Sequence, residues 1–221
     1  MVLRPYLLDL FFPNCCGCCE ARILPEELLC PECTKKLTAQ RTDYAAWKAI
    51  MLEPVPWAGG AAVYPYADTA KAGVLGLKDG TRNFGLHCAA LLAGEIHDTL
   101  PGVPFDAVAW VPVGARRRRR QGYAHAEFLG RNLARELGLP ARDGLLQEHD
   151  DGIRQHTLAA AERKQHALRF THTGQDLTGK TLLLCDDILT TGSTLRRCTE
   201  QLLECGAAAV YVAVIAVRLR E

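Results

Sequence analysis

The chain has 221 residues, and its 26 basic and 25 acidic side chains leave a formal net charge of +1. This length suits one medium-sized α/β domain with a small additional element. The near-zero charge argues against binding of nucleic acid or a membrane surface through bulk charge alone. No stretch approaches the roughly 20 apolar residues of a membrane-spanning helix.

The first residues, MVLRPYLLDLFFP, are largely apolar. Asp9 interrupts the apolar run, and no cleavage site of small residues follows it. We therefore expect a short amphipathic helix that packs on the rest of the chain, and not a signal peptide. Six of the ten cysteines crowd into residues 15–33. That crowding favours a metal site in a reducing compartment, so we expect a cytoplasmic protein.

Two C-x2-C knuckles can be drawn from these cysteines. The possible pairs are Cys15/Cys18 or Cys16/Cys19 for the first knuckle and Cys30/Cys33 for the second. Four cysteines predict a tetrahedral zinc site, because so short a segment gains its folding energy from the metal. The alternatives are a redox pair or unpaired surface thiols. We expect a zinc-binding element over residues 1–40, a linker over 41–60 with its prolines and glycines, and the main domain over 61–221.

From residue 61 onward, short apolar runs alternate with helical patterns. The expected elements are a strand over 61–66, helices over 68–77 and 84–97, a strand over 107–111, a helix ended by Gly138, a strand over 182–185, a helix ended by Gly206 and a strand over 210–217. Alternating strands and helices predict an α/β fold with a mainly parallel sheet and flanking helices.

The stretch TLLLCDDILTTGSTL, residues 181–195, carries the main functional signal. An apolar run ends at two carboxylates, Asp186 and Asp187, so we expect both at the carboxyl end of a buried parallel strand, where ligands collect. The residues that follow are Thr190, Thr191, Gly192, Ser193 and Thr194. Their hydroxyls and the free amides of a helix start suit a phosphate, and the carboxylates suit a sugar or a metal. A solvated turn or a helix cap is the alternative.

A second signal is the sequence WVPVGARRRRRQGYAHAE, residues 110–127. It places five consecutive arginines directly after an expected strand. We expect this loop, with Arg116, Arg117 and Arg120, to bind the polyphosphate part of a substrate. A solvated face or a nonspecific nucleic-acid patch would carry the same residues. Lys78, in the segment VLGLKDG, is a further candidate phosphate ligand, with an exposed helix-end lysine as the alternative.

The stretch CDDILTTGSTL resembles the phosphoribosyl pyrophosphate motif of type I phosphoribosyltransferases. The resemblance implies that Asp186 and Asp187 bind the ribose hydroxyls and that residues 190–194 hold the 5′-phosphate. Magnesium would neutralise the pyrophosphate leaving group.

The order of motifs along the whole chain narrows the resemblance further. Two cysteine knuckles, a VPV strand with arginines and the DDILTTGST stretch resemble the ComF family of competence-associated, phosphoribosyltransferase-like proteins. The family's Q-x2-L-x4-R-x6-F pattern is met by Gln155, Leu158, Arg163 and Phe170. This resemblance implies the register Cys16/Cys19 for the first knuckle.

The chain departs from the ComF pattern at three positions. Ala124 and His125 follow Tyr123 where many members carry Asn-Gln, and His166 stands where Asn is common. These changes fall near the expected substrate region, so the acceptor or the activity could differ from those of the family. We interpret His125, His156 and His166 as surface histidines, since each lies in a polar stretch.

Two functions are compatible with these features. The first is an enzyme that binds phosphoribosyl pyrophosphate with magnesium and transfers ribose 5-phosphate to an acceptor, with residues 150–170 as a lid. The second is a protein without turnover that handles single-stranded DNA alongside the competence machinery, as the resemblance implies. A homo-oligomer is compatible with either.

Overall fold

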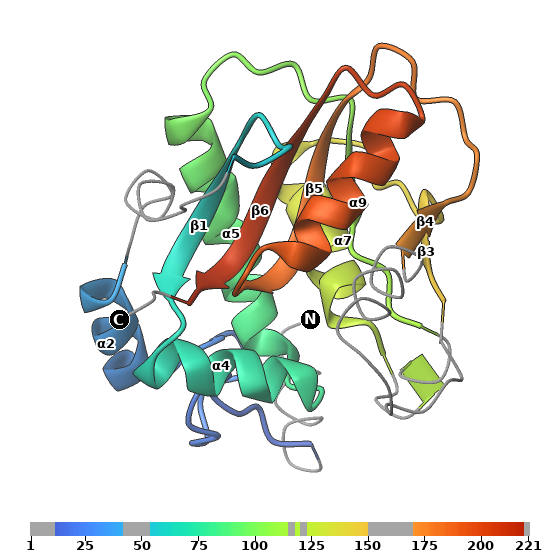
Figure 1. Ribbon diagram of the computed structural model, residues 1–221. Helices are drawn as coiled ribbons and strands as arrows, with labels where there is room; N and C mark the ends of the chain where they lie inside the picture. Colours follow the sequence, from blue (N-terminus) through green and yellow to red (C-terminus); the bar gives the residue numbers. More distant parts are fainter. Residues whose placement is uncertain (1–11, 42–53, 115–117, 120–122, 150–169, 219–221) are drawn as a thin grey trace, which may run out of the picture.

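The computed structural model describes residues 12–41, 54–114, 118–119, 123–149 and 170–218 (Figure 1). In these residues, four strands form one parallel sheet in the order β1-β6-β5-β2. The strands are β1 (Gly59–Pro65), β2 (Ala107–Trp110), β5 (Thr181–Leu189) and β6 (Ala209–Val217). The helices are α2 (Pro31–Ala39), α4 (Asp68–Lys78), α5 (Arg82–Thr99), α7 (His125–Leu137) and α9 (Ser193–Glu204). The expected α/β fold with a mainly parallel sheet is confirmed.

Both faces of the sheet are covered, which is why its strands read as continuous apolar runs. One core layer joins the sheet to α2, α4, α5 and α7, and it includes fully buried Phe84, Leu129 and Leu183. The other core layer joins the sheet to α9 and includes Leu184, Leu195 and Val212, the third of these in β6. Figure 1 shows α9 lying across one face, with α5 and α7 behind the sheet.

The strand β5 is longer than the sequence suggested, and the expectation that it ends before the two carboxylates is wrong. Its pairing with β6 continues to Leu189, which lies opposite Val217. Its pairing with β2 stops earlier, at Cys185 opposite Trp110. The carboxyl-terminal part of β5, including both carboxylates, therefore extends beyond the last paired residue of β2.

The structure differs from the sequence-based expectations at two further places, the β3–β4 pair and the start of β1. A short antiparallel pair, β3 (Leu146–Glu148) and β4 (Phe170–His172), packs against α9 and has no counterpart in the sequence analysis. Strands of three residues carry too little periodicity to be recognised. Gly59 and Gly60, expected in the linker, open β1, where a Cβ on Gly59 would lie 3.1 Å from the Tyr211 ring.

The amino-terminal helix expected before residue 14 and the lid expected over residues 150–170 lie almost entirely outside the described residues. Gln155, His156, Leu158, Arg163 and His166 belong to the same undescribed part. None of the helices in the described residues has the length and apolar character needed to cross a membrane.

Candidate functional site

The second carboxylate of β5, Asp187, contacts side chains from α4 and α7, two helices that cover the same face of the sheet. Asp187 is 6% exposed, and its Oδ2 lies 2.7 Å from Nζ of Lys78 at the end of α4. The same oxygen lies 3.6 Å from Nε2 of His125, the first residue of α7. Asp186 is partly buried and uses its Oδ1 to accept a hydrogen bond from the backbone amide of Asp187 at 2.9 Å. Lys78 is thus brought directly to the acidic pair.

The surroundings of Asp186 and Asp187 shift their pKa values in opposite directions. Burial, together with the adjacent Asp187, raises the pKa of Asp186 well above its ordinary value. Burial acts in the same direction on Asp187, but the charges of His125 and Lys78 and the hydrogen bond from Lys78 outweigh it and lower the pKa of Asp187. Asp187 is therefore the carboxylate that the fold keeps ionised, with Lys78 as its counter-ion.

His125 is the residue of this site that the sequence analysis missed. We interpreted it as a surface histidine, but it is 8% exposed and faces Asp187. The interpretation was wrong because a polar stretch of sequence does not reveal which side chains in the first turn of a helix face the sheet. A usable signal was its place: it opens the helix that follows β2, and β2 neighbours β5.

The hydroxyl-rich segment after β5 forms the entry to α9. Gly192 precedes the helix with φ of +77°, a conformation that glycine adopts without strain. As the N-cap residue it offers no side chain, and the amide of Ser193 donates a long hydrogen bond of 3.4 Å to Oγ1 of Thr191. Thr190, Thr191 and Ser193 are exposed and Thr194 is partly buried. The first amides of an α-helix have no partner within the helix, so this exposed entry suits an anion.

The arginine loop is described only in part, since Arg116, Arg117 and Arg120 lie outside the described residues. The neighbouring Arg118 and Arg119 are exposed, and Arg118 forms an ion pair of 3.0 Å with Glu127 on α7. At the start of the loop, the amide of Gly114 donates a 2.5 Å hydrogen bond to Oε2 of Glu148. A carboxylate therefore already occupies one amide of the loop in this structure.

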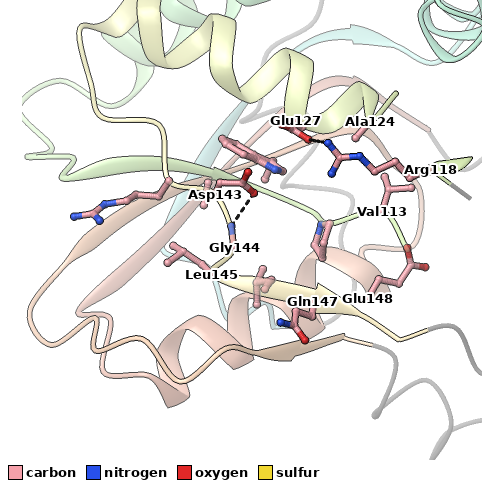
Figure 2. A pocket seen from close by; sticks show the side chains of 14 residues that line it. Val113, Arg118, Ala124, Glu127, Asp143, Gly144, Leu145, Gln147 and Glu148 are labelled. Carbon is pink, nitrogen blue, oxygen red and sulfur yellow. Dashed lines mark hydrogen bonds and ion pairs between the residues drawn. The ribbon is translucent and has the colours of Figure 1, made fainter. Parts of the chain in front are cut away.

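A pocket of about 260 Å³ lies between β2, the start of α7 and β3 (Figure 2). Figure 2 shows Arg118 extended toward Glu127 on one side, with Glu148 nearby and Gly144 on the opposite wall. Trp110 and Val113 add apolar surface. The pocket thus adjoins the arginine loop and combines charged groups with apolar walls.

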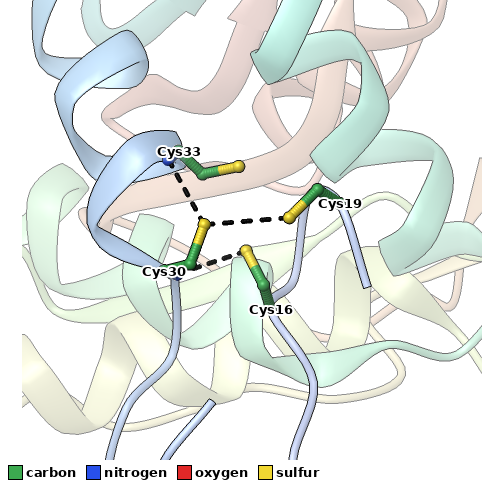
Figure 3. A group of neighbouring side chains, drawn as sticks. All are labelled: Cys16, Cys19, Cys30 and Cys33. Carbon is green, nitrogen blue, oxygen red and sulfur yellow. Dashed lines mark hydrogen bonds between the residues drawn. The ribbon is translucent and has the colours of Figure 1, made fainter. Parts of the chain in front are cut away.

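Four cysteines form the second candidate site (Figure 3). The sulfur atoms of Cys16, Cys19, Cys30 and Cys33 all lie within 4.8 Å of one another. The amide of Cys30 donates to Sγ of Cys16 at 3.3 Å, and the amide of Cys33 donates to Sγ of Cys30 at 3.4 Å. The first knuckle in this structure is therefore Cys16/Cys19, and Cys15 and Cys18 stand outside the group.

The chemistry of the sulfur group fits a metal ion. Burial opposes ionisation of Cys16, but hydrogen bonds from backbone amides, that of Cys30 first, lower its pKa to about 7. Burial and neighbouring thiols raise the pKa of Cys33. Crowded thiols that resist joint ionisation are stabilised by a cation, and four sulfur ligands are a set that zinc binds. Asp186, Asp187 and His125 form another group that could hold a metal ion, with ligand atoms within 4.8 Å of one another.

Part of the chain matches a known protein domain, and most of it is similar to known proteins. The model of the phosphoribosyl transferase domain matches residues 122–221, which include His125, the acidic pair and the entry to α9. The DNA utilization protein YhgH of Salmonella typhi is 28% identical over 201 residues, covering 89% of this chain and 87% of that protein. The protein of the same name in Escherichia coli K12 is 27% identical over 202 residues, with the same coverage.

Two further similarities are partial. Competence protein F of Haemophilus influenzae is 28% identical over 110 residues, which cover 48% of each chain. Among solved structures, glutamine phosphoribosylpyrophosphate amidotransferase from B. subtilis, complexed with ADP and GMP, is similar with a TM-score of 0.44 and 22% identity. That similarity covers 68% of this chain and 28% of the amidotransferase chain. The resemblance drawn from the motifs is confirmed: the chain has a phosphoribosyltransferase-like fold and is similar to DNA utilization proteins and to competence protein F.

Proposed function

We propose that this protein binds 5-phosphoribosyl pyrophosphate with magnesium and transfers ribose 5-phosphate to an acceptor. The observation that carries the proposal is the arrangement at the end of β5. Two carboxylates extend past the end of β2, and the exposed, hydroxyl-rich start of α9 follows within a few residues. A sugar that carries both a diol and a phosphate matches these two features together.

Each group of the site has a role in this proposal. Asp186 and Asp187 accept hydrogen bonds from the ribose hydroxyls, and residues 190–194 with the first amides of α9 hold the 5′-phosphate. The arginine loop, with Arg116, Arg117 and Arg120, binds the pyrophosphate. Lys78 orients Asp187 and adds positive charge beside the ligand. Magnesium, when bound, neutralises charge on the leaving pyrophosphate.

Catalysis in this proposal rests on positioning and electrostatics. As the bond between the sugar and pyrophosphate lengthens, positive charge develops on the ribose and negative charge on the leaving group. In this proposal the ionised Asp187 complements the charge on the ribose, and the arginine loop complements the charge on the leaving group. Lys78 and His125 keep Asp187 ionised, so it is ready to accept hydrogen bonds when the ligand arrives.

The sulfur group belongs to the proposal as a structural zinc site. We propose that Cys16, Cys19, Cys30 and Cys33 hold one zinc ion within a zinc-binding element, residues 1–40, attached to the phosphoribosyltransferase-like domain, residues 61–221. Metal analysis of the purified protein should give one zinc per chain, and less than one in a Cys33→Ser variant.

Calorimetric titration with 5-phosphoribosyl pyrophosphate and magnesium tests the main proposal. We expect binding by the unaltered, zinc-loaded protein and its loss in Asp187→Ala. Asp98→Asn, an exposed carboxylate on α5, is the matched control and should bind like the unaltered protein. Failure of the zinc-loaded, unaltered protein to bind this ligand with magnesium present would overturn the proposal.

A second candidate is a role in handling single-stranded DNA, in competence or DNA uptake. The names of the similar DNA utilization proteins and of competence protein F favour it, and Arg118 and Arg119 offer exposed positive charge. Binding should weaken steeply as salt increases, because phosphate contacts release counter-ions. Arg117→Ala with Arg119→Ala should weaken binding, whereas Arg135→Ala, an exposed arginine on α7, should not. Unchanged DNA binding in the double variant excludes this role for the arginine loop.

A further inference from the structure

We infer that the four-cysteine element positions the acidic pair, because it holds the turn between α4 and α5 from which Lys78 reaches Asp187. In this inference the element is a support of the sugar-phosphate site and not only a surface appendage. Asn83 and Gly17 are its positioning residues. Three successive layers of contact connect the cysteines to the carboxylate of Asp187.

The first layer is a close backbone contact between the first knuckle and α5. Gly17 lies between Cys16 and Cys18 and is buried. A Cβ on Gly17 would lie 2.4 Å from the backbone nitrogen of Phe84, a distance that real Cβ atoms do not show. A Cβ on Gly76 of α4 would lie 3.3 Å from the carbonyl oxygen of Gly17. The knuckle is therefore wedged against both helices at the point where they meet.

The second layer is a pair of hydrogen bonds that cross the same interface. Nδ2 of Asn83 donates to Oδ1 of Asn14 and to the carbonyl of Cys15, each at 2.8 Å. Nδ2 of Asn14 in turn donates to the carbonyls of Leu24 and Glu27, each at 2.7 Å. The first turn of α5 is thereby tied to the residues that open the first knuckle and, through Asn14, to the loop that separates the two knuckles.

The third layer is the turn that joins α4 to α5. The amide of Thr81 donates to the carbonyl of Gly76 at 2.9 Å, and the amide of Gly80 donates to the carbonyl of Leu77. Lys78 lies inside this closed turn, and Leu77 beside it is fully buried in the core layer that also contains Cys16 and Cys33. The backbone of Lys78 cannot shift without disturbing contacts that the knuckle makes.

The consequence concerns the place of the Lys78 ammonium group. A lysine side chain has many rotamers. An ion pair of 2.7 Å with Asp187 therefore depends on where the backbone holds the Cα atom of Lys78. Loss of metal from the sulfur group would loosen the knuckle, then the turn, and then the ion pair. Coupling of this kind runs through a contiguous set of packed residues.

Lysine reactivity measured by mass spectrometry tests the inference on the full-length protein. Lys78 should react with an amine-modifying reagent more slowly than Lys71, which is exposed on the same helix. In Asn83→Ala, and in protein stripped of metal with a chelator, we expect the ratio of the two rates to change by roughly three- to tenfold toward equality. Thr99→Ala, at the far end of α5, should leave the ratio unchanged, and Asp187→Asn shows the value for a broken ion pair.

A ratio that stays at the unaltered value in Asn83→Ala overturns the inference, whatever the stripped protein does. Asn83→Ala retains all four cysteines, so it decides the matter even if removal of the metal unfolds the chain. A second measurement, the affinity for 5-phosphoribosyl pyrophosphate with magnesium, should fall in Asn83→Ala by roughly the same factor. This second measurement rests on the proposed function. If the unaltered protein binds no such ligand, that function fails while the lysine reactivity still tests the inference.

Discussion

The sulfur group and the acidic pair are two clusters of acidic side chains, and the fold balances their charge in different ways. The acidic pair receives Lys78 at 2.7 Å and His125 at 3.6 Å, both from this chain. The sulfur atoms contact one another and the backbone amides of Cys30 and Cys33. One cluster therefore has its counter-ions within this chain, whereas under the zinc proposal the other receives its positive charge from a metal ion.

The largest expected effect is the loss of metal from the sulfur group. We expect chelation, or Cys33→Ser, to destabilise the protein by about 4 kcal/mol or more. For a chain of this size that corresponds to a decrease in Tm of roughly 8–16 °C. Cys15→Ser is the matched control, since Cys15 stands outside the group and should leave Tm nearly unchanged. Equal Tm values for Cys33→Ser and Cys15→Ser would show that the sulfur group holds no structural metal.

The next largest effect concerns the contact between the first knuckle and α5, which links the sulfur group to the rest of the fold. Gly17→Ala forces a Cβ against the backbone of Phe84, and overpacking of this kind costs about 1–3 kcal/mol. Gly94→Ala, in open space on α5, should instead stabilise the protein by about 0.5–1 kcal/mol, because alanine favours a helix. Denaturant unfolding measures both free energies. A neutral Gly17→Ala would mean that the knuckle moves freely against α5.

The two carboxylates should respond oppositely to removal of charge. The pKa of Asp187 is lowered, so its contribution to stability is present above the ordinary value of 3.8 and is lost as pH falls through the folded-state pKa. The pKa of Asp186 is raised, so stability is lost as pH rises from 3.8 through its folded-state pKa. At pH 7 we expect Asp187→Asn to lower the free energy of unfolding by about 1–2 kcal/mol and Asp186→Asn to raise it.

Thermal unfolding between pH 3 and pH 8 measures this pair of effects. The Asp186→Asn difference should shrink as the pH falls from the raised pKa of Asp186 toward 3.8. The Asp187→Asn difference should shrink only as the pH falls below 3.8 toward the lowered pKa of Asp187. Asp98→Asn supplies the baseline for an exposed carboxylate. Asparagine variants that shift Tm in the same direction at pH 7 would contradict the separation of the two groups.

The smallest effect concerns the arginine loop, where Glu148 accepts a hydrogen bond from the amide of Gly114. Glu148→Gln keeps an acceptor oxygen but removes a negative charge from the expected pyrophosphate site. We expect pyrophosphate with magnesium to bind roughly two- to fivefold more tightly, equivalent to about 0.4–1 kcal/mol. Glu136→Gln, an exposed position on α7, should bind like the unaltered protein. Weaker binding by Glu148→Gln would show that the carboxylate supports the loop and does not compete with the ligand.

The sequence by itself determined the elements that have strong local signals. Apolar runs located the four parallel strands, and the helix-ending glycines at 138 and 206 marked where α7 and α9 stop. The DDILTTGST stretch identified the residues of the candidate site because spacing along the chain fixes their position relative to one strand end. The short strands β3 and β4 escaped detection, since three residues give no readable period.

Only the tertiary structure decided which residues from different elements share a site. Spacing left both registers of the first knuckle open, and only the family resemblance implied Cys16 and Cys19. These two face the second knuckle because the loop folds back through the contacts of Asn14 and Gly17. Lys78 and His125 meet at Asp187 because α4 and α7 cover the same face of the sheet. Local periodicity fixes a side chain's direction within its own element, whereas these meetings depend on how the elements pack.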